Sequence, residues 1–215
     1  MLVDSRRGLL VSGSLLLGAA VVTLLYLLPT TRPSVQAVDD AVWRFAGTIH
    51  NAPATAVAVA LSWLGSAVVN WPLRVGALFL LAWRRHWLRA AAFALAVVTS
   101  ELFIGPVKAE IDRPRPPGSL IETSAASFPS GHAIATAVTA VGLVLVLAQP
   151  GRTRWRWEVN AVIFTSVMAL SRVYLRAHWL SDTVAGALLG AGLALGWPAV
   201  LMALRHQRDP TARTS

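Results

Sequence analysis

Several apolar runs in this chain approach the roughly 20 residues that an α-helix needs to cross the hydrocarbon core of a bilayer. The first such run, at about 8–28, directly follows Arg6 and Arg7. Hydrophobic residues make up 55% of the 215 residues and charged residues only 13%, which is too apolar for an ordinary soluble domain. The sequence therefore predicts an all-α, polytopic membrane protein with room for one domain.

The first apolar run resembles a secretory signal peptide in its position behind two arginines. It is longer than the usual ~7–15 apolar residues of a signal peptide, and no clear small-x-small cleavage site follows it. We interpret it as a retained membrane helix. The chain contains no cysteine, which excludes disulfides and thiolate metal sites.

Basic residues gather at alternate ends of the apolar runs, and these groups hold more than half of the 19 Lys and Arg residues. This is the distribution that the positive-inside rule expects of cytoplasmic loops. It also accounts for the net charge of +9, which would suggest nucleic-acid binding in a soluble protein, so no nucleic-acid partner is expected. The four groups are Arg6 and Arg7; Arg84, Arg85 and Arg89; Arg152, Arg154 and Arg156; and Arg205, Arg208 and Arg213.

The basic groups predict a bundle of six transmembrane helices, with the segment 29–51 as an external loop that contains a short amphipathic piece. A short external helix would follow and end near Leu64, and the segment 111–127 would form another external loop. Pro72 and Arg74 fall inside the second span, a feature that the sequence leaves unexplained. The expected spans are 8–28, 66–83, 87–107, 131–148, 159–175 and 182–203.

This topology divides the chain into three parts. Residues 1–52 hold the first transmembrane helix and its external loop, 53–204 form a helical core, and 205–215 form a cytoplasmic tail that is expected to be disordered. Within the last span, the spacings Gly186-x3-Gly190 and Gly192-x3-Gly196 allow close helix contact. We expect these glycines to serve packing inside the bundle rather than dimerisation.

Three short strings carry the chemistry, and the predicted topology brings all of them to the external end of the bundle. A phosphoryl group in transfer spreads negative charge over its oxygens, so fixed cations should surround it. An Arg side chain suits this task because its planar fork donates two parallel hydrogen bonds to phosphate oxygens. The strings are Lys108-x6-Arg115-Pro116, Pro129-Ser130-Gly131-His132 and Ser171-Arg172-x5-His178-x3-Asp182.

The second string opens a helix. Ser130 is a good N-cap, and Gly131 lets a ligand approach the backbone, where the unpaired N–H groups of the first turn attract an anion. His132, in that first turn, is placed to protonate a leaving oxygen. Taken alone, this string favours an ordinary capped helix over a phosphate site.

The third string pairs a histidine with a carboxylate. If the last helix reaches back to His178, that residue and Asp182 lie on one face. Asp182 can then accept from one ring nitrogen and leave the other unprotonated, which is the arrangement of an oriented nucleophile. Taken alone, an interfacial His beside a capping Asp is the alternative.

In this order and spacing, the three strings resemble the type 2 phosphatidic acid phosphatase family, in its membrane, phosphatidylglycerophosphatase B-like branch. The resemblance covers about 63–203. It implies that His178 attacks phosphorus to form a phosphohistidine, that His132 protonates the leaving group, and that Asp182 orients His178. It implies no metal and no other cofactor. Phosphate binding would fall to Lys108, Arg115, Ser130, Gly131 and Arg172.

The resemblance predicts a lipid phosphatase of the cell (inner) membrane, with its site on the extracytoplasmic face and a phosphorylated lipid as partner. Candidate substrates are phosphatidic acid, diacylglycerol pyrophosphate, phosphatidylglycerol phosphate and polyprenyl diphosphate. A non-catalytic lipid-binding or transport protein and a lipid phosphotransferase remain alternatives, and the oligomeric state is open. Outside the motif positions, Arg113 is expected to be solvated, and Glu101 to pair with Arg74 or another polar neighbour.

Overall fold

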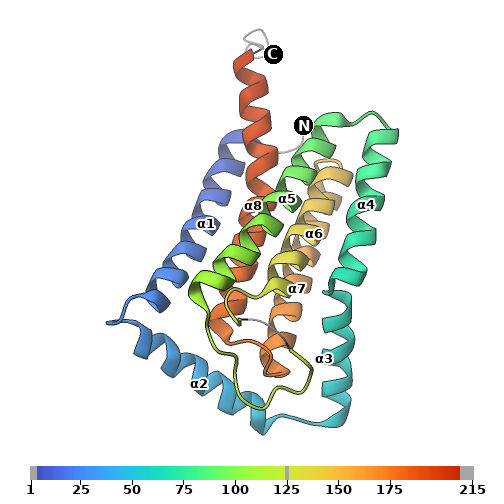
Figure 1. Ribbon diagram of the computed structural model, residues 1–215. Helices are drawn as coiled ribbons and strands as arrows, with labels where there is room; N and C mark the ends of the chain where they lie inside the picture. Colours follow the sequence, from blue (N-terminus) through green and yellow to red (C-terminus); the bar gives the residue numbers. More distant parts are fainter. Residues whose placement is uncertain (1–3, 124–125, 209–215) are drawn as a thin grey trace.

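The computed structural model describes residues 4–123 and 126–208, and within them the chain forms helices and no strand (Figure 1). Within these described residues, eight helices follow one another. They are α1 (Ser5–Leu27), α2 (Arg32–Thr48), α3 (Ala52–Leu64), α4 (Ala67–Trp83), α5 (Trp87–Ile111), α6 (Gly131–Leu147), α7 (Arg152–Tyr174) and α8 (Leu180–Arg208).

The all-α membrane architecture is confirmed. Among the described residues, α1, α5 and α8 are each long and apolar enough to cross a bilayer. Together, α3 and α4 make a fourth candidate span that is bent by 40° at the break between them. The helix boundaries at this break, Leu64 and Ala67, agree with the predicted end and start. By length and composition the fold thus holds three or four candidate spans, and the count of six stays a prediction.

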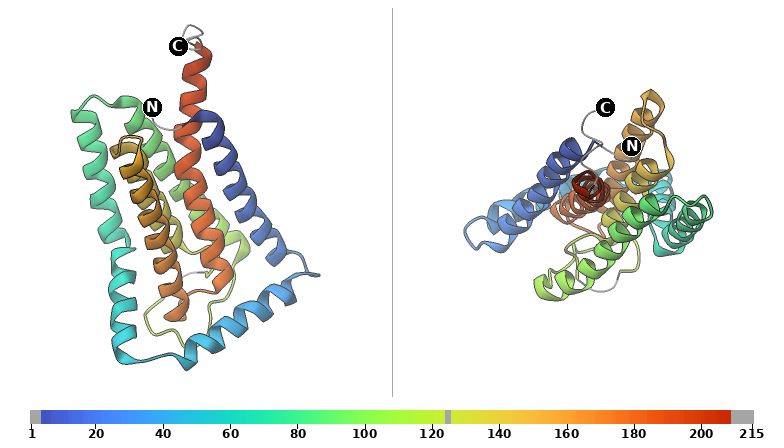
Figure 2. Two further views of the ribbon diagram at one scale, coloured as in Figure 1. Left: turned by 180° about the vertical axis from the view of Figure 1, so that it is seen from behind. Right: turned by 90° about the horizontal axis from the view of Figure 1, so that it is seen from above.

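Helix α8 lies in the middle of the bundle, where it packs against α1, α5, α6 and α7 (Figure 2). The glycines of α8 allow the neighbouring helices to approach it closely. Gly186 and Gly190 face α6, and a Cβ atom on Gly190 would lie 2.6 Å from the carbonyl oxygen of Ile134. Gly192 and Gly196 face α1 in the same way. The expected role of these glycines in packing within the bundle is confirmed.

Residues 29–51 differ from the expected loop. Instead of a short amphipathic piece they form α2, a helix of 17 residues that runs across one end of the bundle (Figure 1). Pro33 stands in its first turn, where a missing N–H costs nothing, and neither proline nor glycine follows until Gly47. The segment can therefore stay helical along almost its whole length.

Other helix ends also lie beyond their predicted positions. Helix α5 continues through Ile111, so Lys108 belongs to its last turn instead of following it. Helix α7 begins at Arg152, so the basic group 152–156 forms its first turns rather than a loop. Helix α8 continues to Arg208, which makes 205–208 helical, while the rest of the predicted tail lies outside the described residues. The predicted range of α6 is correct to within one residue.

The arginine inside α4 has a partner, which explains how it is tolerated there. Arg74 is buried, and its Nη1 lies 2.7 Å from Glu101 Oε1 on α5. Its Nε also donates to Thr139 Oγ1 of α6 at 2.9 Å. The expected pairing of Glu101 with Arg74 is confirmed, and it joins three helices.

The two ends of the bundle hold different segments of the chain. One end holds the start of α1, the α4–α5 and α6–α7 turns and the end of α8 (Figure 1). The opposite end holds α2, the segment between α5 and α6, and the turn between α7 and α8. All three sequence strings belong to this second end.

Candidate active site

The first and third strings are joined through backbone carbonyls. Lys108 Nζ donates to the carbonyl oxygen of Ala126 at 2.6 Å, and Arg115 Nη2 donates to the same oxygen at 3.4 Å. Arg115 Nη1 also donates to the carbonyl oxygen of Ala177, next to His178, at 2.7 Å. Two cations predicted to bind phosphate therefore lie side by side, close to the predicted nucleophile.

The third predicted cation, Arg172, is buried at the end of α7. Its Nη1 donates to Ser62 Oγ on α3, whereas its buried Nε has no hydrogen-bond partner among the described residues. Within the same part of the chain, neither Arg172 nor Lys108 forms an ion pair with a carboxylate. Their charges are thus available to an anionic ligand.

His178 lies in the turn between α7 and α8, two residues before α8 begins, rather than in the first turn of that helix. Its Nε2 is 3.3 Å from Arg115 Nη1, and its Nδ1 is 3.5 Å from Asp182 Oδ2. A guanidinium can only donate hydrogen bonds, so the Nε2 facing it must be the unprotonated nitrogen. This tautomer carries its proton on Nδ1, toward Asp182, as an oriented nucleophile requires.

Burial controls the charge of these groups. It lowers the pKa of the His178 imidazole to about 4, and the positive charges of Arg115 and Arg172 act in the same direction, against the opposing effect of Asp182. The ring is therefore neutral at pH 7 and has a free lone pair. Burial also lowers the pKa of Arg115, whose guanidinium nevertheless stays charged at neutral pH.

Asp182 is fully buried, and four groups surround its carboxylate. Besides His178, Oδ2 accepts hydrogen bonds from the Trp179 backbone N–H at 2.9 Å and from Ser127 Oγ. The other oxygen, Oδ1, lies 2.6 Å from Arg113 Nη1. These contacts fix the carboxylate in place, so that its position beside His178 does not depend on the histidine itself.

Arg113 was expected to be solvated, and this expectation is wrong. Its side chain is only 1% exposed and bridges two buried carboxylates, Asp182 Oδ1 at 2.6 Å and Asp39 Oδ2 of α2 at 2.7 Å. Its guanidinium also stacks over the Tyr26 ring, 4.1 Å from the centroid. Without these two partners a buried guanidinium would be strongly unfavourable.

No sequence signal separated Arg113 from Arg115. In an extended stretch residues 113 and 115 fall on the same side, so alternation gives no reason to place one in the protein interior and the other at the phosphate. Nothing in the sequence pointed to Asp39, because it lies more than seventy residues away in a segment that was expected to be mostly loop.

The second string has the predicted local structure. Ser130 is the N-cap of α6, and its Oγ accepts from the Ala133 backbone N–H at 3.4 Å. Its own N–H donates to the carbonyl oxygen of Asp182 at 3.1 Å, which joins the start of α6 to α8. A Cβ atom on Gly131 would meet nothing within 4 Å, so the start of the helix borders open space. His132 lies close enough to Arg115, Arg172 and His178 for their charges to act on it.

No group of three or more His, Cys, Asp or Glu side chains that could hold a metal ion gathers anywhere in 4–123 or 126–208. The carboxylates near the site are instead bound by arginine, hydroxyl and backbone N–H groups. Independence from metal stays a prediction for experiment.

Known proteins resemble this chain in both sequence and structure. The sequence model of the PAP2 superfamily matches residues 87–206, more than half of the chain. Phosphatidylglycerophosphatase B of Bacillus subtilis strain 168 is 30% identical over 166 residues, which cover 73% of this chain and 80% of that protein. Decaprenylphosphoryl-5-phosphoribose phosphatase of Mycobacterium tuberculosis is 33% identical, over 63% of this chain and 74% of its own length.

A third relative, undecaprenyl-diphosphatase of Sulfolobus acidocaldarius, is 38% identical over 68 residues, which span only 30% of that protein. Among solved structures, the transmembrane PAP2-type phosphatidylglycerolphosphate phosphatase of Bacillus subtilis superposes with a TM-score of 0.76 at 25% identity. That match covers 95% of this chain and 98% of the other. The three motif strings, the all-helical membrane fold and these matches agree: the chain belongs to the PAP2 superfamily and is a membrane lipid phosphatase.

Proposed function

We propose that the enzyme removes the terminal phosphate of a lipid phosphomonoester or diphosphate through a phosphohistidine at His178. The observation that carries this proposal is the orientation of the His178 ring. Its Nε2 faces Arg115 at 3.3 Å, and its Nδ1 faces the buried Asp182 carboxylate at 3.5 Å. The unprotonated nitrogen therefore points to the cations that would hold the phosphate.

In the first step, the lone pair of His178 Nε2 attacks phosphorus as the bond from phosphorus to the leaving oxygen breaks. The negative charge of the bound phosphate offsets the nearby cations and favours protonated His132, which donates its proton to that oxygen, so the lipid alcohol or lipid monophosphate leaves protonated. Lys108, Arg115 and Arg172 stabilise the charge on the three nonbridging oxygens. Asp182 balances the positive charge that develops on the attacking ring.

In the second step, a water molecule attacks phosphorus and gives a proton to His132, which the first step left unprotonated. The N–P bond breaks, inorganic phosphate leaves, and both histidines return to their starting states. The open space beside Gly131 supports a phosphate at the start of α6, where backbone N–H groups point to it. No step needs a metal ion.

An apolar groove supports a lipid as the substrate. It lies between α2, α3 and α7, has a volume of about 690 Å³, and is lined along α7 as far as Ser171 and Tyr174. Ser171 is the neighbour of Arg172 in the chain, so a hydrocarbon chain in the groove would place its phosphate near that cation. Two relatives are named for undecaprenyl and decaprenyl compounds. A polyprenyl-linked phosphate or diphosphate is therefore our first candidate.

We further propose a cell-membrane protein of six spans with its active site on the extracytoplasmic face. The described members of the basic groups support this orientation. They lie at the start of α1, around the α4–α5 turn, at the start of α7 and near the end of α8, at the opposite end of the bundle from the site (Figure 1). Basic residues favour the cytoplasmic side of a membrane.

Phosphate release by the purified protein in detergent with EDTA tests the proposal. The lipid panel would include phosphatidic acid, phosphatidylglycerol phosphate and a polyprenyl diphosphate, assayed with the wild type and with His178→Ala. We expect metal-independent release that is lost in the variant and is fastest with the polyprenyl lipid. Equal release by His178→Ala would contradict the mechanism, whereas faster cleavage of a glycerolipid would contradict only the choice of substrate.

A further inference from the structure

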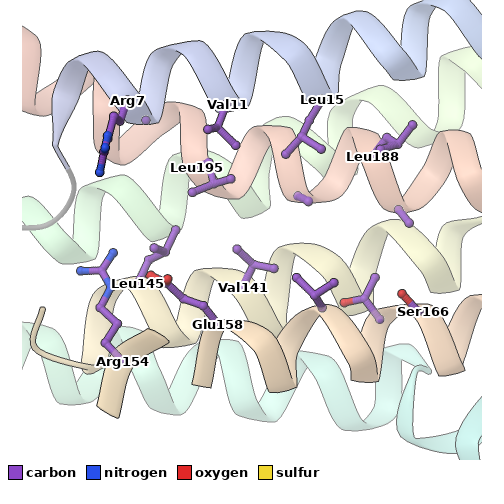
Figure 3. A pocket seen from close by; sticks show the side chains of 15 residues that line it. Arg7, Val11, Leu15, Val141, Leu145, Arg154, Glu158, Ser166, Leu188 and Leu195 are labelled. Atoms are coloured by element: carbon purple, nitrogen blue, oxygen red, sulfur yellow. Dashed lines mark hydrogen bonds and ion pairs between the residues drawn. The ribbon is translucent and has the colours of Figure 1, made fainter. Parts of the chain in front are cut away.

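A second cavity lies far from the active site, toward the opposite end of the bundle. It has a volume of about 540 Å³ and is enclosed by α1, α6, α7 and α8, with aliphatic side chains from all four helices along its walls (Figure 3). Along α7 its lining extends from Arg154 to Ser166. Twelve residues of helix correspond to about 18 Å, slightly more than half of the about 30 Å hydrocarbon core of a bilayer. The cavity thus has the length of one acyl chain in one leaflet.

The cavity separates α1 from two of its neighbours. Helix α1 packs mainly against α8, with α2 at its far end, and the apolar side chains of α1 that face α6 and α7 line this space instead of filling it. Val11 and Leu15 of α1 point toward Val141 and Leu145 of α6 across the cavity (Figure 3). An apolar chain here would bury these facing surfaces, which is favourable in proportion to the area covered.

The end of the cavity near the start of α1 and α7 is charged. Arg7 extends from α1 toward α7, and Arg154 extends from α7 toward α1 (Figure 3). Arg154 is buried, and its Nε pairs with Glu158 Oε1 at 2.8 Å. Among the residues that line the cavity, Arg7 and Arg154 carry a positive charge and Glu158 alone carries a negative one. Basic pockets of this kind between membrane helices bind anionic lipid head groups.

From this combination we infer that the cavity binds one anionic phospholipid. Its phosphodiester head group lies between Arg7 and Arg154, and one acyl chain extends along the cavity toward Ser166. This site is separate from the active site, which lies at the other end of the bundle. A phosphodiester lipid also carries no terminal phosphate for the active site to remove, so the inference does not depend on the proposed reaction.

Native mass spectrometry of the purified protein tests the inference, with phosphatidylglycerol and phosphatidylcholine of identical acyl chains and with inorganic phosphate present to occupy the active site. We expect tighter retention of phosphatidylglycerol. Arg7→Gln should weaken it about fivefold, the effect of one cation near a head group. Val11→Trp should abolish retention of phosphatidylglycerol by filling the cavity, because Val11 lines it.

Each variant has a matched control on the same helix. Arg6→Gln removes the same charge from an exposed residue outside the cavity, and Leu10→Trp adds the same bulk at a position that is 65% exposed and does not line it. Both controls should retain phosphatidylglycerol like the wild type. Equal retention of the two lipids by the wild type, or equal losses in variants and controls, would overturn the inference in favour of lipid bound around the whole protein without a defined site.

Discussion

The charge state of His178 is set by its burial and by the charges of its neighbours. Its pKa of about 4 lies below the ordinary value of 6.5, so the imidazole stays neutral until the pH falls to about 4. We predict that the acid limb of kcat/KM, corrected for ionisation of the substrate phosphate, falls about tenfold per pH unit below that point. A pH profile of the purified enzyme measures this, and an acid limb near pH 6.5 would contradict the burial of the ring.

Arg113 supports the site without touching the phosphate. Arg113→Gln leaves two buried carboxylates without their cation, so we predict a loss of about 3–5 kcal/mol in the free energy of unfolding. The freed charge on Asp182 should also favour protonated His178, which moves the acid limb of kcat/KM to higher pH. Thermal unfolding and the pH profile measure these two effects, and a merely structural role would leave the acid limb unchanged.

Arg32 offers a matched control for this substitution. It stacks on the same Tyr26 ring at 4.9 Å, but it forms no ion pair with a carboxylate among the described residues. Arg32→Gln should therefore change stability little and leave the pH profile as in the wild type. Equal effects of the two substitutions would show that the bridge between Asp39 and Asp182 is unimportant.

Motif spacing predicted which residues gather around the proposed phosphate site, but it did not predict the residues behind them. In our proposal Lys108, Arg115 and His178 serve one shared ligand, and such a group leaves a recognisable spacing in the sequence. The role of Arg113 depends on Asp39, which reaches it only through the placement of α2. Such a contact between distant segments leaves no spacing that a single sequence can display.

The close contact between α6 and α8 depends on glycine. A Cβ atom on Gly190 would lie 2.6 Å from a backbone carbonyl oxygen of α6, which cannot rotate away. We predict that Gly190→Ala lowers the free energy of unfolding by about 1–3 kcal/mol through overpacking. Thermal unfolding measures this. Gly13→Ala in α1 is the control, because its Cβ would meet nothing within 4 Å, and equal losses would contradict the packing argument.

The helices could be predicted where long apolar runs form them, and their ends where a cap or a glycine marks them. The start of α6 follows directly from the N-cap at Ser130, and the break at Gly65 from the glycine itself. Helix α2 carries too many polar residues to be recognised as a span, and its helical state depends on the burial of Asp39 and Ala46 against the bundle. The sequence shows its amphipathic pattern but not the surface that it covers.

The orientation of the whole molecule in the membrane can be tested directly because the chain contains no cysteine. Single cysteines would be placed at Leu120, which is 43% exposed at the active-site end, and at Thr153, exposed at the start of α7. We predict that an impermeant maleimide labels Leu120→Cys on intact cells and labels Thr153→Cys only after permeabilisation. The reverse pattern would place the active site on the cytoplasmic side.

The phosphohistidine is the central claim, and isolating it is its most direct test. With p-nitrophenyl phosphate the leaving group needs no proton, so His132→Ala should still form the intermediate but hydrolyse it slowly. We predict an acid-labile, base-stable phosphate on the peptide that contains His178, seen by mass spectrometry, and no label in the double variant His132→Ala/His178→Ala. A phosphate on another residue, or turnover in the double variant equal to that of His132→Ala, would contradict the account.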